Sequence, residues 1–343
     1  MCARNDSAVA HARAAKFIIG LHILAEGLFI YMHAQIGIML EGQAGLNWAR
    51  WKRILQTAED SGYQSVFRSD HFIIGKAEDS LELWISLAYA ASHTKRIEFG
   101  PLVTPVTFRH PSLTIRYATA VDDLSEGRLV LGVGAGWHAD EHVRWGIPFY
   151  DVPTRFQMFQ DQLAITTRLL NSAVPVTYLG KHFAVREALL LPRPARAGGP
   201  PLLIGGNGLK RTLPLVVRYA KEWNAVFIDQ ATYKQRAAEL DQLLLHAGRP
   251  ATDVKRSLMT RVVYGRNEAE VTARLVAAGE DRAKLLESGC VVGTPHQIID
   301  QLGAWTQLGV ERFMLQWLEL DDIAGLESLA TTVLPSFHTA SPV

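Results

Sequence analysis

The stretch Gly127–His142 reads Gly-Arg-Leu-Val-Leu-Gly-Val-Gly-Ala-Gly-Trp-His-Ala-Asp-Glu-His, and its pattern indicates the fold class. It contains a short apolar run, from Leu129 to Val133, with turn residues on both sides. Such a run is typical of a strand that is buried on both faces of a parallel sheet. Glycines, an aromatic residue, two histidines and two carboxylates follow it, at the end where parallel sheets open to ligands.

Apolar runs and helical periodicity alternate along the chain on both sides of this strand. We predict eight strands, at residues 35–40, 64–68, 96–103, 129–133, 201–204, 223–228, 256–264 and 311–317. The helices between and after them are predicted at residues 46–61, 80–92, 111–124, 155–170, 210–220, 232–246, 268–278, 294–307 and 321–337. Asp79 or Ser80 is the expected N-cap of the second helix.

This count predicts an α/β fold, a (β/α)8 TIM barrel that forms a single domain over residues 35–337. The alternation pauses after strand four, so an insertion is expected at about residues 145–200. Within it, residues 174–192 are predicted to form a hairpin that turns at Gly180-Lys181. Residues 338–343 are expected to be a tail.

The amino-acid composition limits the kinds of molecule that the protein is expected to bind. The 343 residues are 48% hydrophobic, and 35 basic and 34 acidic residues give a formal net charge of +1. A nucleic-acid-binding protein usually shows a basic excess, so no nucleic-acid partner is expected. The two cysteines, Cys2 and Cys290, cannot form a disulfide framework. Their scarcity suits a reducing cytoplasm, where we expect the protein to reside.

Residues 1–34 precede the alternation and are expected to lie outside the barrel. Residues 17–34 are apolar apart from His22, Glu26 and His33. A short helix docked on the domain or an unstructured extension is expected there, and a signal peptide is the alternative. No small-x-small cleavage site follows, and Glu26 in the middle of a spanning helix would be costly, so no membrane association is expected.

Candidate site residues lie just past strands two to five, at the end of a barrel that carries active sites. Asp70 and His71 follow strand two, and a loop from Thr104 to Pro111 follows strand three. Gly134, Gly136 and Trp137 follow strand four. The group after strand five is Gly205, Gly206, Asn207 and Gly208, with Lys210 and Arg211 next.

The glycines at 205–208 open a predicted helix, where free amides and the helix dipole would form an anion site. Lys210 and Arg211 add positive charge, so a phosphate fits there. An ordinary glycine-rich turn with a solvated basic pair is the alternative, and barrel phosphate sites more often follow strands seven and eight. A Rossmann site at Gly132–Gly136 is rejected, because no second strand ending in an acidic residue follows at the required distance.

The Asp70-His71 pair is compatible with proton transfer, a metal site or a structural cap. Histidine as a residue type exchanges protons near neutral pH, which suits a general acid or base. His138–His142 spells the zinc motif H-x-x-E-H, but it directly follows a glycine turn instead of lying within a helix. We interpret this as a chance match and expect no metal.

Aromatic residues at the same rim either form the walls around a flat ring or pack together as a cover. They are Phe72, Phe108, Trp137, Trp145, Phe149 and Tyr150.

Together, these stretches resemble the bacterial luciferase-like monooxygenase superfamily, most closely its branch that uses the deazaflavin coenzyme F-420. The resemblance covers roughly residues 35–317 and leaves residues 1–34 outside. The matching stretches are Gly37–Leu40, Ser65–Phe72, Leu102–Pro111, Gly127–Trp137, Leu203–Thr212 and Arg218–Asn224.

The resemblance implies that a flavin-like ring lies in the barrel mouth, with its phosphate near Gly205 and Gly206. It also implies a bulge after strand three, near Leu102, where some members carry a non-proline cis peptide. His71 would be the catalytic, proton-handling residue. The candidate cofactor-binding residues are Asp70, Leu102, Thr104, Gly134, Gly136, Trp137, Gly205, Gly206, Asn207, Lys210 and Arg211.

One departure from the family pattern bears on the substrate. Sugar-phosphate dehydrogenases of this family place a glutamate directly after the Gly-x-Gly of strand four, whereas this chain has Trp137. We therefore expect a small, apolar organic substrate, and the resemblance implies hydride transfer with coenzyme F-420. The alternatives are an FMN-dependent monooxygenase, a cofactor-binding protein without turnover and, more remotely, a metal-dependent hydrolase. A homodimer through apolar helices such as Leu81–Ala91 is a further expectation.

Overall fold

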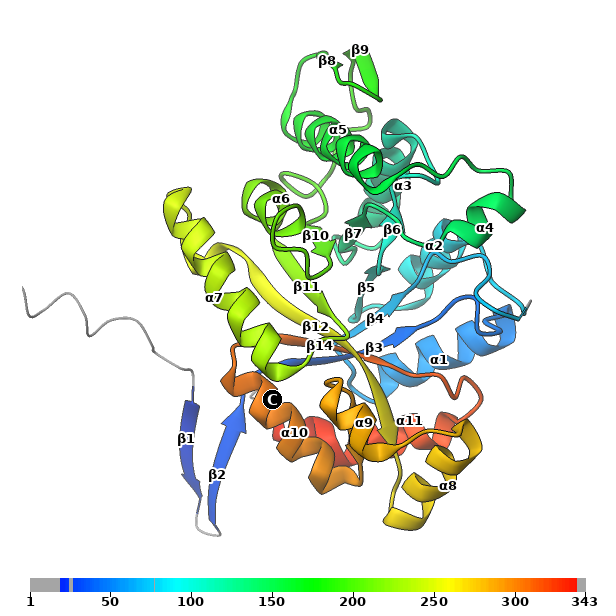
Figure 1. Ribbon diagram of the computed structural model, residues 1–343, viewed down its shortest axis with the longest axis vertical. Helices are drawn as coiled ribbons and strands as arrows, with labels where there is room; N and C mark the ends of the chain where they lie inside the picture. The colour runs from blue at the N-terminus through cyan, green and yellow to red at the C-terminus, as the bar shows by residue number, and fades with distance from the viewer. Residues whose placement is uncertain (1–18, 25–26, 77, 338–343) are drawn as a thin grey trace, which may run out of the picture.

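The fold is a barrel of eight parallel strand positions with helices around it (Figure 1). It is seen in a computed structural model that describes residues 19–24, 27–76 and 78–337. Every neighbouring pair in the barrel is parallel, which confirms the predicted fold class. In chain order the strands are β3 (Gln35–Leu40), β4 (Ser65–Arg68), β5 (Glu98–Pro101) with β6 (Thr104–Pro105), β7 (Leu131–Gly134), β10 (Leu202–Gly205), β11 (Glu222–Val226), β12 (Lys255–Tyr264) and β14 (Arg312–Gln316).

The third strand position is split, so the single strand predicted over residues 96–103 is wrong in detail. Strand β5 pairs with β4, whereas β6 pairs with β7. The peptide bond Leu102–Val103 between them is cis, at the place that the family resemblance implies. Phe99 joins β5 to the start of the next strand, since its carbonyl accepts from the amide of Val130 at 2.9 Å.

Helices follow the strands, and most lie within a few residues of their predicted positions. They are α1 (Trp48–Asp60), α2 (Leu83–His93), α3 (Pro111–Leu124), α6 (Thr212–Tyr219), α7 (Gln230–His246), α8 (Glu268–Ala278), α10 (Pro295–Gln307) and α11 (Ile323–Val333). Helix α2 begins later than predicted because Ser80 forms a β-bridge with Leu46. Its N-cap is Glu82, whose side chain accepts from the amide of Ile85 at 2.7 Å, and the predicted cap at Asp79 or Ser80 is wrong.

The segment between β7 and β10 holds the insertion. It contains α4 (Ala139–Arg144), α5 (Val152–Asn171) and the hairpin of β8 (Val176–Leu179) and β9 (Ala184–Ala188). Figure 1 shows α5 and this hairpin together at the top of the molecule. The hairpin and α5 were predictable from sequence, whereas α4 was not, because it is short and directly follows the glycine-rich turn.

Three other segments depart from the predictions. Residues 19–32 contain an antiparallel pair, β1 (Ile19–Leu24) and β2 (Gly27–Met32), instead of a helix, in keeping with their glycines and β-branched and aromatic residues. Residues 17, 18, 25 and 26 of that prediction lie outside the described part. Helix α9 (Arg282–Glu287) and strand β13 (Val291–Gly293) follow α8, and β13 pairs with β12. The closing helix ends at Val333 and continues as the 3-10 turn η2 (Leu334–Ser336); another such turn, η1, spans Ala251–Asp253.

Buried apolar side chains pack together inside the barrel. One cluster comprises Met39, Phe67, Leu102, Val130, Leu203, Met259 and Met314. On the outside, α2 and α3 expose apolar side chains, among them Ile85, Leu113 and Tyr117. The homodimer expected through apolar helices such as Leu81–Ala91 stays a prediction. None of the helices in the described ranges is both long and apolar enough to cross a membrane.

Candidate active site

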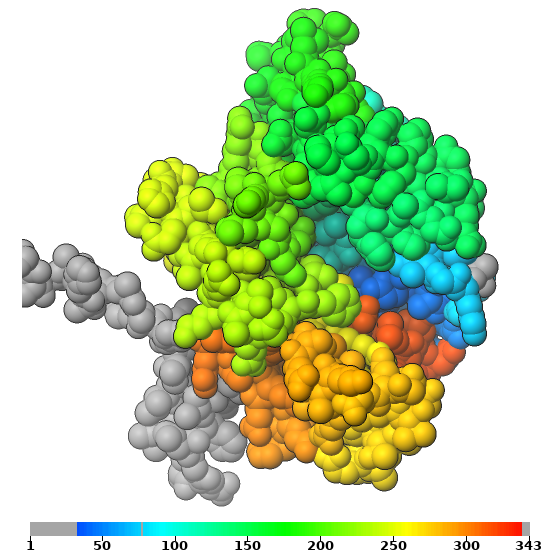
Figure 2. All heavy atoms as spheres, viewed as in Figure 1, coloured from blue at the N-terminus to red at the C-terminus, as the bar shows by residue number. Residues whose placement is uncertain are grey.

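A cavity of about 410 Å³ lies at the carboxyl ends of the barrel strands, and this volume is typical of small-molecule sites. Figure 2 shows this face hollowed at its centre, between the green insertion and the yellow-green segment that follows β10. Eight of the candidate residues line the cavity: Asp70, His71, Leu102, Gly134, Gly136, Trp137, Gly205 and Gly206. The other four, Thr104, Asn207, Lys210 and Arg211, lie outside its wall.

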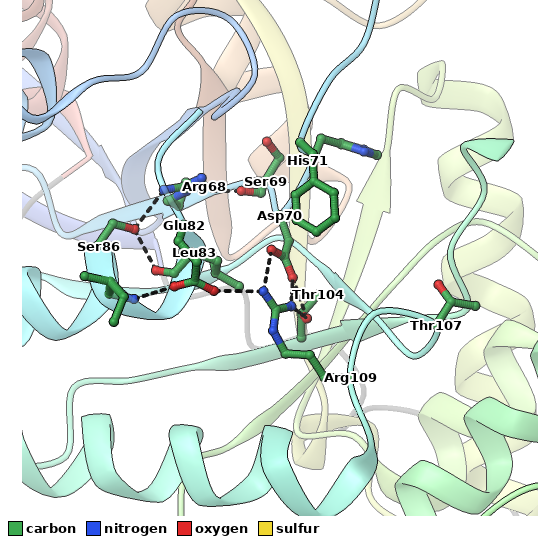
Figure 3. Close-up of polar contacts among 12 residues, drawn as sticks. Arg68, Ser69, Asp70, His71, Glu82, Leu83, Ser86, Thr104, Thr107 and Arg109 are labelled. Carbon is green, nitrogen blue, oxygen red and sulfur yellow. Dashed lines mark hydrogen bonds and ion pairs between the residues drawn. The ribbon is translucent and has the colours of Figure 1, made fainter. Parts of the chain in front are cut away.

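Asp70 is buried just after β4, and neighbouring side chains donate to both of its carboxylate oxygens. Thr104 donates its hydroxyl hydrogen to Asp70 Oδ2 at 2.7 Å. Arg109 donates to both carboxylate oxygens of Asp70 and also to Glu82 Oε1, at 2.9 Å. Figure 3 shows the guanidinium of Arg109 lying between these two carboxylates. Asp70 therefore presents a carboxylate with a fixed counter-ion to the cavity.

Burial and neighbouring charges have opposite effects on the pKa values of Asp70 and Arg109. Burial raises the pKa of Asp70, while the charge and hydrogen bonds of Arg109 and the bond from Thr104 oppose the rise. Burial alone would lower the pKa of Arg109, but Asp70 and Glu82 outweigh it, and that pKa is raised. The guanidinium thus stays charged and keeps Asp70 paired. Sequence analysis placed Arg109 in the loop after strand three but gave no signal for this pairing.

Arg68 fixes the loop beneath the site. Its guanidinium is wholly buried and donates to the carbonyls of Ser69 and Leu81 and to Ser86 Oγ, at 3.1, 2.7 and 2.8 Å. Burial lowers the pKa of Arg68 to about 10, so it remains charged at neutral pH. These bonds hold the chain where Asp70 and His71 leave the barrel.

His71 points away from the Asp70 network in Figure 3 and interacts with Glu141 instead. Its Nδ1 lies 2.8 Å from Glu141 Oε1, and the amide of Phe72 donates to Oε2 at 3.0 Å. A carboxylate oxygen accepts, so Nδ1 carries the hydrogen, and Nε2 has no hydrogen-bond partner among the described residues. Glu141 is 1% exposed, which makes this a buried and fixed partner. The sequence prediction missed Glu141 as a site residue.

His142 lies one residue further along α4 and is held as a neutral ring. Its Nδ1 donates to the carbonyl of His138 at 2.6 Å, and its Nε2 accepts from Thr107 Oγ at 2.7 Å. Burial lowers the pKa of His142, in agreement with this neutral arrangement.

Residues 139–142 of the H-x-x-E-H stretch lie in α4, so the expectation that the stretch lies outside a helix is wrong for all but His138, which is the N-cap. However, its glutamate and second histidine are occupied by His71 and Thr107. Within the described ranges, no group of three or more histidine, cysteine, aspartate or glutamate side chains is placed to hold a metal ion.

The aromatic residues divide into two groups. Phe72 stacks on Phe108 with ring centroids 4.4 Å apart and meets Trp145 at 5.4 Å, so these rings pack on one another as a cover. Trp137 instead lines the cavity, is 65% exposed and meets the His71 ring edge-on at 5.5 Å. An exposed indole beside His71 gives the cavity an apolar wall.

The turn after β10 differs from the predicted glycine nest. The amide of Gly206 donates to the Asn224 carbonyl at 2.9 Å, and the Asn207 side chain is bonded to the backbone of Val226. Helix α6 begins at Thr212, so the glycines do not open it as predicted. Among the described residues, the amides of 208–211 make no backbone hydrogen bond. The free amides and the exposed Lys210 and Arg211 thus lie in this turn, and the Arg211 guanidinium is 5.7 Å from the ring of the cavity residue Phe156.

The back wall of the cavity is formed where Val103 packs against two glycines. Val103, next to the cis peptide, reaches between Gly134 and Gly205. A Cβ atom at Gly134 would lie 2.7 Å from Val103 Cγ2, and one at Gly205 would lie 3.2 Å from Val103 Cγ1. Only glycine leaves Val103 undisturbed at position 134, and the resulting wall is apolar. Residues of this kind fit the face of an isoalloxazine-like ring.

The chain matches the model of the family described as luciferase-like monooxygenase over residues 27–279. It belongs to the luciferase-like monooxygenase family. The match begins earlier and ends earlier than the stretch 35–317 over which the sequence motifs run.

Curated relatives of this family member include two kinds of enzyme. The chain is 31% identical over 219 residues to an F-420-dependent glucose-6-phosphate dehydrogenase of Microbacterium testaceum, covering 60% of this chain and 62% of the relative. It is 30% identical over 200 residues to a 4-hydroxyprotoasukamycin monooxygenase of Streptomyces nodosus subsp. asukaensis, covering 58% of this chain and 52% of the relative. The chain thus covers less than two thirds of the length of either relative.

Solved structures share the fold. An F-420-dependent secondary alcohol dehydrogenase in complex with an F-420–acetone adduct superposes with a TM-score of 0.79 at 20% identity, covering 90% of this chain and 100% of the other. A long-chain alkane monooxygenase superposes with a TM-score of 0.75 at 14% identity, covering 90% and 93%.

Proposed function

We propose that this protein is an oxidoreductase that binds coenzyme F-420 and acts on a small organic molecule, with His71 as the proton-handling residue. The observation that carries this proposal is the His71–Glu141 pair on the cavity wall, which leaves Nε2 of the ring free. The family and its F-420-dependent relatives support the choice of cofactor. When bound, the deazaflavin supplies or accepts a hydride.

The cavity offers separate places for the parts of such a cofactor. The ring would rest on the wall formed by Leu102 and Val103 and by the glycines at 134 and 205. The phosphate would bind the amides of residues 208–211, with Lys210 and Arg211 adding charge. The polar edge of the ring would meet Asp70, whose carboxylate Arg109 and Thr104 hold in place.

His71 would then transfer the proton that accompanies oxidation or reduction of the substrate. Glu141 keeps hydrogen on Nδ1, so Nε2 can accept a proton and later return it. Such a positioned acid or base is worth roughly 10²- to 10⁴-fold in rate. Trp137 would contact an apolar part of the substrate beside His71.

The test is His71→Ala, with the affinity for coenzyme F-420 measured in parallel by fluorescence quenching. We expect turnover to fall by at least about 100-fold while cofactor affinity stays within a few-fold. The matched control is His93→Ala, because His93 is exposed on α2 and lines no part of the cavity. Equal turnover of the two variants would remove His71 from the mechanism.

A second candidate is an FMN-dependent monooxygenase, because a relative of similar identity is a monooxygenase. The apolar wall at Val103 suits either ring system. Titration with both cofactors, with oxygen consumption recorded during turnover, separates the two. Tight FMN binding with substrate-dependent oxygen uptake would favour the monooxygenase.

A further inference from the structure

The charged groups on the cavity wall are unbalanced. Three carboxylates line it, those of Glu41, Asp70 and Glu141, whereas no lysine or arginine of the described chain does. Asp70 is paired with the charged guanidinium of Arg109, and Glu141 accepts a hydrogen bond from His71. Glu41 has no basic partner within ion-pair distance among the described residues; within that part of the chain, its carboxylate accepts hydrogen bonds from two side-chain amides alone, those of Gln43 and Gln316. The carboxylate of Glu41 therefore leaves a negative charge on the cavity wall that no basic side chain of the described residues pairs with.

The carboxylate of Glu41, directly after β3, is fixed in place. Oε1 accepts from Gln316 Nε2 at 2.7 Å, and Oε2 accepts from Gln43 Nε2 at 2.9 Å. The amide of Gln43 is itself oriented, since its Oε1 accepts from Ser69 Oγ at 2.8 Å. A carboxylate has about four acceptor sites, so roughly two remain open on Glu41.

A second acceptor lies on the same wall. Asn224 is wholly buried on β11, and its Oδ1 has no hydrogen-bond partner among the described residues. The orientation of its amide is fixed, because Ser257 Oγ donates to the Trp223 carbonyl and therefore accepts from Asn224 Nδ2, at 3.0 Å. A buried acceptor without a partner is costly unless a ligand donor meets it.

We infer, resting on the proposed function, that the substrate carries a positively charged nitrogen, an ammonium or iminium group, which binds Glu41. A further N–H of the bound molecule meets Asn224 Oδ1. The remainder of the substrate is apolar and contacts Trp137. A substrate with a phosphate or carboxylate group beside Glu41 is rejected, because its charge repels that carboxylate and no lysine or arginine of the described residues lines this wall.

The experiment measures the affinity of three compounds that share one carbon skeleton: benzylammonium, benzyl alcohol and benzoate. Binding is followed by calorimetry on the purified full chain at neutral pH. The variant is Glu41→Gln, which removes the charge but keeps hydrogen-bonding capacity. The control is Glu287→Gln, because Glu287 is an exposed carboxylate on α9 that lines no part of the cavity.

In the wild type and in the Glu287→Gln control, benzylammonium should bind at least about tenfold more tightly than benzyl alcohol and benzoate. In Glu41→Gln this preference should disappear. An undiminished preference in Glu41→Gln, equal or tighter binding of benzoate by the wild type, or no binding of benzylammonium at all would each overturn the inference. If Glu41→Gln does not fold, the relative affinities of the wild type for the three compounds test the inference by themselves.

Titration with coenzyme F-420 keeps this result distinct from the proposed function. Selective benzylammonium binding without F-420 binding would leave the charge inference standing and refute the cofactor. F-420 binding without selective benzylammonium binding would refute only the inference about the charge of the substrate.

Discussion

Replacing Glu141 by glutamine removes the acceptor that fixes the tautomer of His71 and changes the side chain very little in size. The carboxylate accepts from His71 Nδ1 at 2.8 Å and from the amide of Phe72 at 3.0 Å, one bond on each oxygen. A glutamine has one acceptor oxygen and can satisfy only one of these donors. If its oxygen stays on Phe72, its NH2 group faces Nδ1, and the imidazole hydrogen moves to Nε2.

The expected loss of activity follows from the strength of the hydrogen bond that is lost. A hydrogen bond to a charged group contributes about 1.5–3 kcal/mol, and we expect kcat to fall roughly 10- to 150-fold. The matched control is Asp140→Asn in the same helix, because the Asp140 side chain is 53% exposed and its ion pair is with Arg144, four residues further along the helix. This control should keep nearly full activity, since exposed i,i+4 pairs contribute little.

Two assays check this prediction. Turnover is followed through the absorbance of the cofactor, and nitrogen chemical shifts of the imidazole report which ring nitrogen carries hydrogen. We expect Nδ1–H in the wild type and in Asp140→Asn, and a shift towards Nε2–H in Glu141→Gln. If Glu141→Gln matches the control in both assays, Glu141 does not position His71.

Three further changes test other parts of the site. Arg109→Met leaves Asp70 buried without a counter-ion and should lower the free energy of unfolding by about 3–5 kcal/mol in urea titration; a loss no larger than that of the exposed Arg53→Met would contradict the pairing. Gly134→Ala places a Cβ 2.7 Å from Val103 and should weaken F-420 binding about tenfold, whereas unchanged affinity would show that this wall does not hold the ring. Because the pKa of His142 is lowered in the folded protein, the unfolded chain takes up its proton first as pH falls from about 7 towards 5. Over this pH range the free energy of unfolding of the wild type should therefore fall more than that of His142→Gln. The extra fall should be up to about 1.4 kcal/mol per unit of difference between the folded and unfolded pKa. Equal pH dependence of the two proteins would contradict this prediction.

The barrel was predictable because each strand is a short apolar run with turn residues at its ends, and Gly127–His142 alone shows the pattern. Tertiary contacts account for the errors in detail. Pairing of Ser80 with Leu46 delays α2, and the turn at Leu102–Val103 divides the third strand. Such pairings join residues far apart in the chain, so local periodicity does not reveal them.

The site was predictable as a list of positions but not as a set of pairs. Asp70 and His71 followed from their place after strand two, but Arg109 lies 39 residues from Asp70 and Glu141 lies 70 residues from His71. The only signal for Glu141 was the H-x-x-E-H spelling, which the preceding glycine turn led us to dismiss. Glu41 directly follows the first barrel strand, and its position at that strand end is a signal that sequence reasoning did not use.

The central claim is that a flavin-like ring lies against the wall at Val103, with His71 within reach of its reactive edge. A crystal structure of the protein with coenzyme F-420 tests this most directly. We expect the ring to rest on Leu102 and Val103, with the phosphate at residues 208–211 and His71 Nε2 facing the ring across the space left for substrate. A structure in which the cofactor binds elsewhere, or in which side chains of the protein itself fill the mouth, would contradict the account.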